Sequence, residues 1–566
     1  MFSNNNTAVA ERLIRFNQEA EERDAQRRAS KLKKPYLNLI KTPIEIEALA
    51  LIPKAVALEN RIAVVNLVNK DLIVAVFDLS NPKIEEEVKK IESLGYRVQL
   101  FIVSESSLRH AFSFYQYVVK KGDDIVGKVS INAEDIELLK KTIKTVADLS
   151  KNLLALNFNS LPVAKLVGSV LGGAMALSAS DVHFEPTKDG VAVRLRIDGV
   201  LQEVFGVQTH EFIPSDFYKQ IVSRIKLLAG LKLNIRDEAQ DGRFTIGLKI
   251  HDVEVRVAVA PSEFGEVMVL RILDPRAIQV GFSDLGFSDY DLKTIEQELK
   301  KPNGMILNTG PTGSGKTTTL YSFLRKVSTP ENKVITIEDP IEYHLEGIEQ
   351  TQVDGAANYT FALGLRSLMR QDPDVILVGE IRDEDTASIA VNAALTGHLV
   401  LSTLHTNNAA GAIARLVDLK VKENIITSAV NLVIAQRLVR KVCVKCAKKR
   451  ELNSDEKNKV AKFLQKFSGR EDLKKIKTVS AVYEVIKNNN CEACGGVGYK
   501  GRVGLFELMV IDDNIRKIVE SEASLTDIEK IAVQNGMMKM QEDGIVKVLN
   551  GVTTFPEVER VTGVID

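Results

Sequence analysis

The sequence centres on Gly310-Pro-Thr-Gly-Ser-Gly-Lys316-Thr317, which fits G-x-x-x-x-G-K-[ST], the phosphate-binding loop of proteins that bind nucleoside triphosphates. The residues before it, Met305-Ile-Leu-Asn-Thr309, are predicted to form a short buried strand, and residues 318–325 are predicted to open a helix. The glycines let the backbone turn tightly so that its N–H groups face phosphate oxygens, and the helix N-terminus adds a favourable dipole. With strand, loop and helix in order, a chance match is a poor alternative.

This loop predicts which residues hold a nucleotide such as ATP. Lys316 would reach the β- and γ-phosphates, and the Thr317 hydroxyl would ligate Mg²⁺. The full set of predicted nucleotide-binding residues is Gly310, Pro311, Thr312, Gly313, Ser314, Gly315, Lys316, Thr317 and Thr318.

Two more stretches are predicted to be buried strands that end in carboxylates. Val334-Ile-Thr-Ile is followed by Glu338-Asp339-Pro340, and Val375-Ile-Leu-Val, a Walker B-like strand, is followed by Gly379-Glu380. Ligands of open α/β sheets bind at the carboxyl ends of the strands, where an acid can orient and deprotonate the attacking water. Glu338 is the first choice for the general base and Glu380 would organise Mg²⁺ and water, but these two roles could be exchanged.

Two histidines, His398 and His405, flank a further apolar stretch at residues 399–404. A single histidine would more often be an ordinary core or surface residue. Two of them around a strand of a nucleotide-binding domain suggest a sensor of the γ-phosphate.

The four cysteines form two C-x-x-C pairs, Cys443 with Cys446 and Cys491 with Cys494. Four thiolates are a common ligand set for tetrahedral Zn²⁺. A redox-active dithiol is the alternative, but two matched pairs with glycines behind the second favour structural zinc. The lysine-rich insertion between the pairs is predicted to be solvated helix.

Composition limits the classes of protein to which the chain can belong. Its 566 residues predict three or four domains, and its 75 basic and 75 acidic residues give zero formal net charge. A general nucleic-acid binder needs a basic surface, so no nucleic-acid partner is expected. No uncharged apolar run is long enough to span a bilayer, and the N-terminus has no secretory-signal pattern, which together predict a cytoplasmic protein.

The pattern of strands, helices and turns predicts a mixed α/β multidomain protein. Its segments are a polar tail at 1–34, a first N-terminal α/β adaptor domain at 36–125, a helical linker at 126–160, a second N-terminal domain at 161–275, the P-loop domain at 288–440, a tetracysteine zinc module at 441–505 and a helical C-terminal region at 506–566.

These motifs resemble those of the PilB/GspE group of secretion ATPases, the motors of type IV pilus assembly and type II secretion. The resemblance covers roughly residues 36–566. It is carried by the phosphate-binding loop, the acidic box at 337–340, the segment 368–383, the histidine box at 397–407, the four cysteines, and three matches to the family's second N-terminal domain at 180–186, 194–199 and 240–243.

The resemblance implies a RecA-like ATPase domain in a homo-hexameric ring, with a PAS-like second N-terminal domain lying over the nucleotide. It implies that Arg194, Arg196 and Arg243 reach bound phosphate when that domain closes. It also implies docking to an inner-membrane platform protein of the PilC/GspF type without membrane insertion, at the inner face of the cytoplasmic membrane. Pilus assembly is the first expectation and type II secretion the alternative. A nucleic-acid translocase and a scaffold that binds nucleotide without hydrolysing it are less favoured.

Overall fold

The computed structural model describes residues 4–42, 44–68, 71–93, 95–117, 128–130, 139, 141–156, 162–248, 251–355, 357–467, 470, 473, 476, 479–486 and 491–565. The chain divides into two compact units, essentially the residues up to 272 and those from 273 onward. The short segments 144–147 and 198–200 belong to the second unit.

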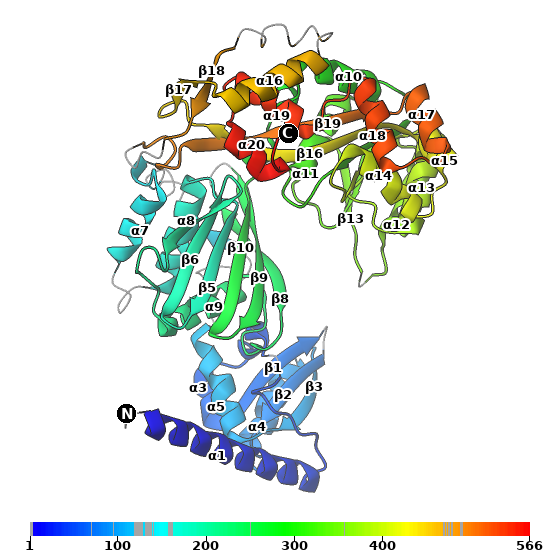
Figure 1. The fold of residues 1–566 in the computed structure, drawn as a ribbon. Coiled ribbons are helices and arrows are strands. Elements are labelled where there is room, and N and C mark those ends of the chain that lie inside the picture. The colour runs from blue at the N-terminus through cyan, green and yellow to red at the C-terminus, as the bar shows by residue number, and fades with distance from the viewer. Residues whose placement is uncertain are drawn as a thin grey trace. The chain divides into compact units, whose positions relative to one another are not determined.

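The first N-terminal domain is built on a three-stranded sheet in the order β1-β2-β3 (Figure 1). The pair β1–β2 is antiparallel, whereas β2 and β3 are parallel and are connected through helix α4. The elements are α2 (Ile46–Leu49), α3 (Lys54–Asn60), β1 (Ile62–Val68), β2 (Asp71–Val76), α4 (Pro82–Ser93), β3 (Arg97–Ile102), α5 (Glu105–Ser113) and a 3₁₀ turn (Phe114–Tyr117).

The predicted polar tail is instead a helix, α1 (Asn4–Lys31), whose second half packs on this domain. Ala25 and Ala29, one turn apart, are buried at 0% and 2% exposure. Glu22 is also buried, and its carboxylate accepts hydrogen bonds from three hydroxyls, those of Tyr36, Ser104 and Ser107. These donors satisfy the buried charge, so a helix with a polar composition can still dock.

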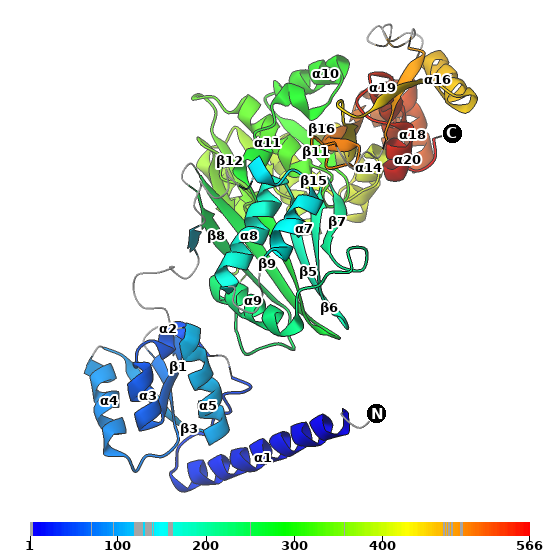
Figure 2. The ribbon, with the colours of Figure 1, turned by 90° about the vertical axis from the view of Figure 1, so that its left-hand side faces the viewer.

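The second N-terminal domain is a seven-stranded sheet in the order β4-β8-β9-β10-β5-β6-β7. Helices α8 and α9 pack together on one face of it (Figures 1 and 2). The elements are β4 (Lys128–Ser130), α7 (Val146–Leu154), α8 (Val163–Ala176), β5 (Asp181–Thr187), β6 (Gly190–Ile197), β7 (Val200–Phe205), α9 (Ser215–Leu228), β8 (Gln240–Gly247), β9 (Asp252–Ser262) and β10 (Gly265–Leu273).

Strand β4 adds a strand to the segment 126–160, which was predicted to be a helical linker. It pairs in parallel with β8, with Lys128 opposite Thr245. Three residues are too few to show a strand period in sequence, so only the pairing reveals the strand. Much of the remaining predicted linker lies outside the described residues.

The P-loop domain is a seven-stranded sheet in the order β13-β12-β14-β15-β11-β16-β19, parallel except for the pair β16–β19. Alternate residues of its strands enter two cores: Met305 and Leu307 face helices α12 to α15, while Ile306 faces α10 and α11. Burial on both faces explains the near-continuous apolar runs of these strands.

The bounds of these elements are α10 (Asp289–Leu299), β11 (Gly304–Thr309), α11 (Lys316–Val327), β12 (Val334–Glu338), β13 (Glu349–Gln352), α12 (Phe361–Leu368), β14 (Val375–Val378), α13 (Glu384–Leu395), β15 (Leu399–Leu404), α14 (Ala409–Asp418), α15 (Glu423–Ala429), β16 (Val430–Val442) and β19 (Tyr499–Val510). Short 3₁₀ turns lie at Pro275–Ile278, Phe282–Leu285 and Met369–Gln371.

The cysteine module is continuous with this sheet, which corrects the predicted boundaries at 440/441 and 505/506. Strands β16 and β19 form one antiparallel ladder from Leu432 opposite Val510 to Val442 opposite Tyr499. The remaining elements are β17 (Lys448–Glu451), α16 (Ser454–Lys466), β18 (Ala481–Glu484), α17 (Asp513–Glu520), α18 (Leu525–Gln534), α19 (Met540–Leu549) and α20 (Phe555–Thr562).

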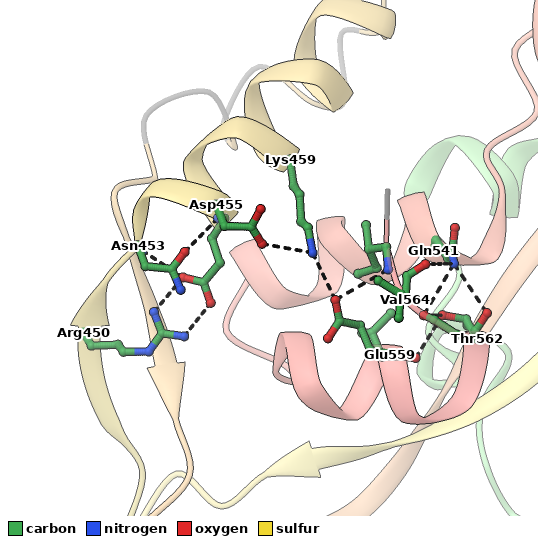
Figure 3. Close-up of polar contacts among 12 residues, drawn as sticks. Arg450, Asn453, Asp455, Lys459, Gln541, Glu559, Thr562 and Val564 are labelled. Atoms are coloured by element: carbon green, nitrogen blue, oxygen red, sulfur yellow. Dashed lines mark hydrogen bonds and ion pairs between the residues drawn. The ribbon is translucent and has the colours of Figure 1, made fainter.

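Helix α16, in the lysine-rich insertion, is attached to the C-terminal helix α20 rather than free in solvent. Figure 3 shows the Lys459 ammonium between Asp455 of its own helix, at 3.1 Å, and Glu559 of α20, at 3.2 Å. Val460 and Phe463 of α16 are buried in the core shared with α19 and α20. Parts of the insertion lie outside the described residues, so the prediction of solvated helix is corrected only for α16.

Protonation of Glu557 in α20 is expected to destabilise the protein in acid. Its carboxylate, 1% exposed, accepts hydrogen bonds from Arg440 at 2.7 and 3.0 Å and from Arg560 at 2.7 and 2.9 Å. Burial alone would raise the pKa of Glu557, but the hydrogen bonds from Arg560 and Arg440 outweigh it and lower that pKa to about 2. The ionised carboxylate therefore stabilises the fold above the unfolded pKa of about 4.3, and this contribution is lost as the pH falls toward 2.

The measurement is chemical unfolding between pH 7 and pH 2. Wild-type protein should lose stability steeply below about pH 4.5, and Glu557→Gln should already be less stable at pH 7 by about 3 kcal/mol, because the largely buried Arg440 and the half-exposed Arg560 both lose their anion. Glu559→Gln, on the same helix but partly exposed, is the matched control. Identical acid profiles for wild type and Glu557→Gln would contradict the assignment.

Candidate nucleotide-binding site

The phosphate-binding loop joins β11 to α11, as the sequence predicts, and close packing requires a glycine at positions 310 and 315. Gly315 caps α11 with φ of 91°, and a Cβ there would lie 2.8 Å from the Gln436 side-chain nitrogen. A Cβ on Gly310 would lie 2.5 Å from the Gln436 carbonyl oxygen. Strand β16 therefore fixes the loop from one side.

Lys316 folds back over the loop that precedes it. Its ammonium donates hydrogen bonds to the carbonyl oxygens of Gly310, at 2.7 Å, and Pro311, at 3.2 Å. Burial lowers the pKa of Lys316; the charge of Glu380 acts against this shift, and the charge of Arg437 adds to it. Both side chains are therefore close enough to act on the loop's lysine.

Gln436 is a residue of the site that sequence reasoning missed. Its buried side-chain oxygen accepts hydrogen bonds from Asn308, in the strand before the loop, and from Thr319, in the helix after it, both at 2.9 Å. A glutamine directly after the apolar run Leu432–Ala435 was the available signal. Gln436 thus supports both flanks of the loop at once.

Glu338, at the end of β12, is buried at 5% exposure with both carboxylate oxygens engaged. The Tyr321 hydroxyl donates to one oxygen at 2.5 Å, while Thr336 and Gln350 donate to the other at 2.7 and 3.1 Å. Burial, and after it the charge of Glu338, raise the pKa of Tyr321, which keeps this donor protonated. Both carboxylate oxygens of Glu338 are therefore already occupied by donors from the same chain.

Glu380, just after β14, lies in more open surroundings among charged side chains. Arg382 donates a hydrogen bond to one of its oxygens, and the His405 Nε2 lies 3.4 Å from the other. Arg382 also lies 3.6 Å from Asp339. The structure therefore brings Lys316, Glu380 and His405 together at the carboxyl edge of the parallel sheet, where ligands of such sheets bind.

The prediction that His398 senses the γ-phosphate is wrong for the nucleotide site of its own chain. His398 precedes β15, whose first residue, Leu399, pairs with Gly304 at the start of β11. The phosphate-binding loop follows the other end of β11, so the full length of the strand separates His398 from it. The His398 ring instead contacts the Ala393 carbonyl oxygen at 3.0 Å.

The three predicted arginines lie in the second N-terminal domain, and each has a carboxylate partner there. Arg194 lies 2.5 Å from Glu185, Arg196 lies 3.4 Å from Asp181, and Arg243 lies 4.0 Å from Glu254. Arg194 and Arg196 share one face of β6, and Arg243 is in strand β8. A bound phosphate would compete with these carboxylates for the guanidinium donors.

The four cysteine sulfurs come together, all within 4.8 Å of one another. Cys443 and Cys491 are 3.8 Å apart, and Cys446 and Cys494 are 3.6 Å apart. Tetrahedral coordination with Zn–S bonds of about 2.3 Å separates sulfurs by about 3.8 Å. The cluster is therefore compatible with Zn²⁺.

Among the described residues, no helix is long and apolar enough to cross a membrane.

Comparison with protein families gives two matches. A family described as Type II/IV secretion system protein matches residues 157–560, and one described as MshEN domain matches residues 32–118. The second match falls on the first N-terminal domain described above.

Individual relatives match most of the chain. The type IV pilus assembly ATPase PilB of Myxococcus xanthus is 38% identical over 93% of this chain and 88% of its own length. The type II secretion system ATPase E of Vibrio cholerae is 35% identical over 93% of this chain and 99% of its own length. Among solved structures, the ATPase DotB of Legionella pneumophila matches with a TM-score of 0.50 and 22% identity, over 70% of this chain and 95% of that one, which is a likeness of fold.

Proposed function

Because this chain belongs to the Type II/IV secretion system protein family, we propose that it is an ATP-hydrolysing motor that powers type IV pilus assembly. The observation that carries the proposal is the near full-length match to PilB of Myxococcus xanthus, at 38% identity over 93% of the chain. The described site supports it, since Lys316, Glu380 and His405 meet where a nucleotide would bind.

The roles of the individual residues are part of the proposal. Lys316 and the loop amides hold the phosphates, and the Thr317 hydroxyl ligates Mg²⁺, a hard cation that takes oxygen ligands and neutralises phosphate charge. We assign Glu380 to orient the attacking water, because the three donors on Glu338 already occupy both of its oxygens. In this proposal Glu380 is the general base and Glu338 shapes the site. The sequence alone favoured Glu338 as the base but left open that the two acids exchange roles.

The assembly around the motor follows from the family. We propose a homo-hexamer, located in the cytoplasm and peripheral to the inner face of the cytoplasmic membrane, that acts on a platform protein of the PilC/GspF type. The four cysteines would hold Zn²⁺. Type II secretion is the second candidate, because the Vibrio cholerae relative named for that system also spans 93% of the chain.

Two measurements test the proposal. Purified protein should release phosphate from ATP in the presence of Mg²⁺. A pull-down of the full chain from its source cells should recover a multi-spanning membrane protein encoded near pilin-like proteins. Absence of ATP turnover would refute the enzyme assignment. Recovery of a secretion-specific platform protein instead would select the second candidate.

Arg196→Ala is expected to reduce ATP turnover by roughly 10³-fold or more, as for arginines that stabilise phosphoryl transfer from another domain or subunit. The fold should survive, because Asp181 keeps Arg271 as a partner at 2.9 Å. Mixing Arg196→Ala chains with Lys316→Ala chains tests where the arginine acts, since recovered activity means delivery across a subunit boundary. Full activity of Arg194→Ala, Arg196→Ala and the double variant would refute the role of both arginines.

A further inference from the structure

Arg437 of β16 is a half-buried cation that lacks a strong partner. Its guanidinium donates to the side-chain oxygen of Asn407 at 3.2 Å, and to the carbonyl oxygens of Gln436 and Asn407 at 3.4 and 3.5 Å. Across the described part of the chain, no carboxylate lies within 4 Å of it. By contrast, Arg440 three residues later is fully engaged by Glu557.

Glu507 is the carboxylate whose charge affects Arg437, but its oxygens already accept hydrogen bonds from other groups. Glu507, opposite Ala435 on the neighbouring strand β19, is buried and accepts hydrogen bonds from the backbone N–H groups of Ala409 and Met540 at 3.1 and 3.3 Å. These are the first residues of helices α14 and α19, so Glu507 offsets the positive ends of two helices. Burial lowers the pKa of Arg437, and Glu507 only opposes this effect.

The position of Arg437 places its charge at the phosphate-binding loop. Strand β16 lies next to β11, on the side away from β15, and Ala435 pairs with Thr309, the last residue before the loop. The following residue, Gln436, packs so closely against Gly310 and Gly315 that a Cβ atom on either glycine would collide with it. The Arg437 side chain reaches Asn407, in the segment that carries His405, so it lies between the loop and the histidine box.

We propose that Arg437 is a phosphate-binding residue of this site, which supplies a second fixed cation to the phosphate chain of the nucleotide from β16. A half-buried guanidinium without an anion is costly, and a phosphate oxygen is the partner that its planar donors fit best. The inference rests on the proposed nucleotide site and adds a residue that the phosphate-loop motif does not contain. It acts within the same chain, unlike an arginine delivered by another domain.

The competing explanation is that Arg437 only supports the histidine-box loop through its contacts with Asn407. The two explanations predict different effects of removing Arg437 on the stability of the nucleotide-free protein. If Arg437 only held that loop, removing it would lower the melting temperature of the nucleotide-free protein. If Arg437 awaits an anion, Arg437→Met removes an unpaired half-buried charge, and the nucleotide-free protein should melt at the same or a higher temperature. The stabilisation that ligand provides should shrink in the variant.

The experiment is calorimetric titration of the full-length protein with ADP and, separately, with inorganic pyrophosphate, both with Mg²⁺, together with melting curves. Arg437→Met should weaken both ligands roughly 10- to 100-fold, the effect of one charge-assisted contact. Arg437→Lys should recover part of the affinity. Lys441→Met is the matched control. It removes one positive charge from the same strand, six residues after the last pair between β16 and β11, and should bind both ligands like wild type.

Unchanged affinity of Arg437→Met for both ligands would overturn the inference, whatever its melting temperature. A lower melting temperature of the nucleotide-free variant, with a loss of affinity that lysine does not restore, would overturn it as well, because that result marks a structural arginine. Wild-type protein that binds neither ligand would instead refute the proposed function, a failure seen before any variant is compared.

Discussion

Replacing Glu380 by glutamine is expected to lower steady-state ATP hydrolysis by roughly 10²- to 10⁴-fold, while ATP affinity stays within a few-fold of wild type. The carboxylate would contact the attacking water and the charge that develops on it, so its loss affects the transition state more than the bound substrate. Glutamine keeps the size of the side chain and can still accept from Arg382. Phosphate release and fluorescent-nucleotide binding on the same preparations measure the two quantities.

Glu338→Gln is the informative comparison, since the two acids are matched in chemistry but not in surroundings. We expect a smaller loss of rate with a lower melting temperature, because the donors from Tyr321, Thr336 and Gln350 lose a buried anionic acceptor. If Glu338→Gln loses more rate than Glu380→Gln at unchanged stability, the general base is Glu338 after all.

Each chain is expected to carry one tightly bound Zn²⁺, and losing it should unfold the cysteine module. Structural zinc sites of this kind contribute on the order of 10 kcal/mol to folding. Cys491→Ser should abolish zinc binding and lower the melting temperature strongly. Nucleotide binding should be retained, because the rungs of the β16–β19 ladder beside the loop, from Leu432 to Arg437, lie away from the cysteines. Elemental analysis, thiol titration and melting curves provide the measurements.

The control for zinc is Val444→Ser, between the first two cysteines, whose side chain is 82% exposed and should be dispensable. Wild-type protein with well under half a zinc per chain, and four thiols that titrate freely, would contradict the prediction. A disulfide between the paired cysteines in fresh protein would favour the redox alternative.

Local motifs explain what sequence could predict here. The strand, loop and helix around Lys316 are contiguous, so the glycine pattern and the apolar strand before it specify that part of the fold directly. The mixed α/β class and the ATPase family are confirmed for the same reason: their signals lie in short stretches. The cysteine pairs, although separated by an insertion, are predicted to meet because a metal needs four ligands, and their sulfurs do meet.

Contacts between distant segments explain what sequence could not predict. Gln436 and Arg437 reach the loop only because β16 pairs with β11. His398 and His405 flank one strand, and the end that lies beside the phosphate-binding loop is decided by the parallel pairing of β15 with β11, which a list of residues does not show. Helix α1 looked like a tail because its buried positions are alanines and one carboxylate, whose partners come from α5 and the segment before β1.

The ladder between β16 and β19 also constrains how the protein is made. During synthesis, β16 leaves the ribosome well before β19, because the whole cysteine insertion is translated between them. At about 5–20 residues per second, this 13-residue strand spends several seconds as an open edge of mostly Val, Leu and Ile. Such an edge is a template for pairing with another chain. A nascent or truncated chain that ends inside the insertion therefore exposes the strand that supports its nucleotide site to aggregation.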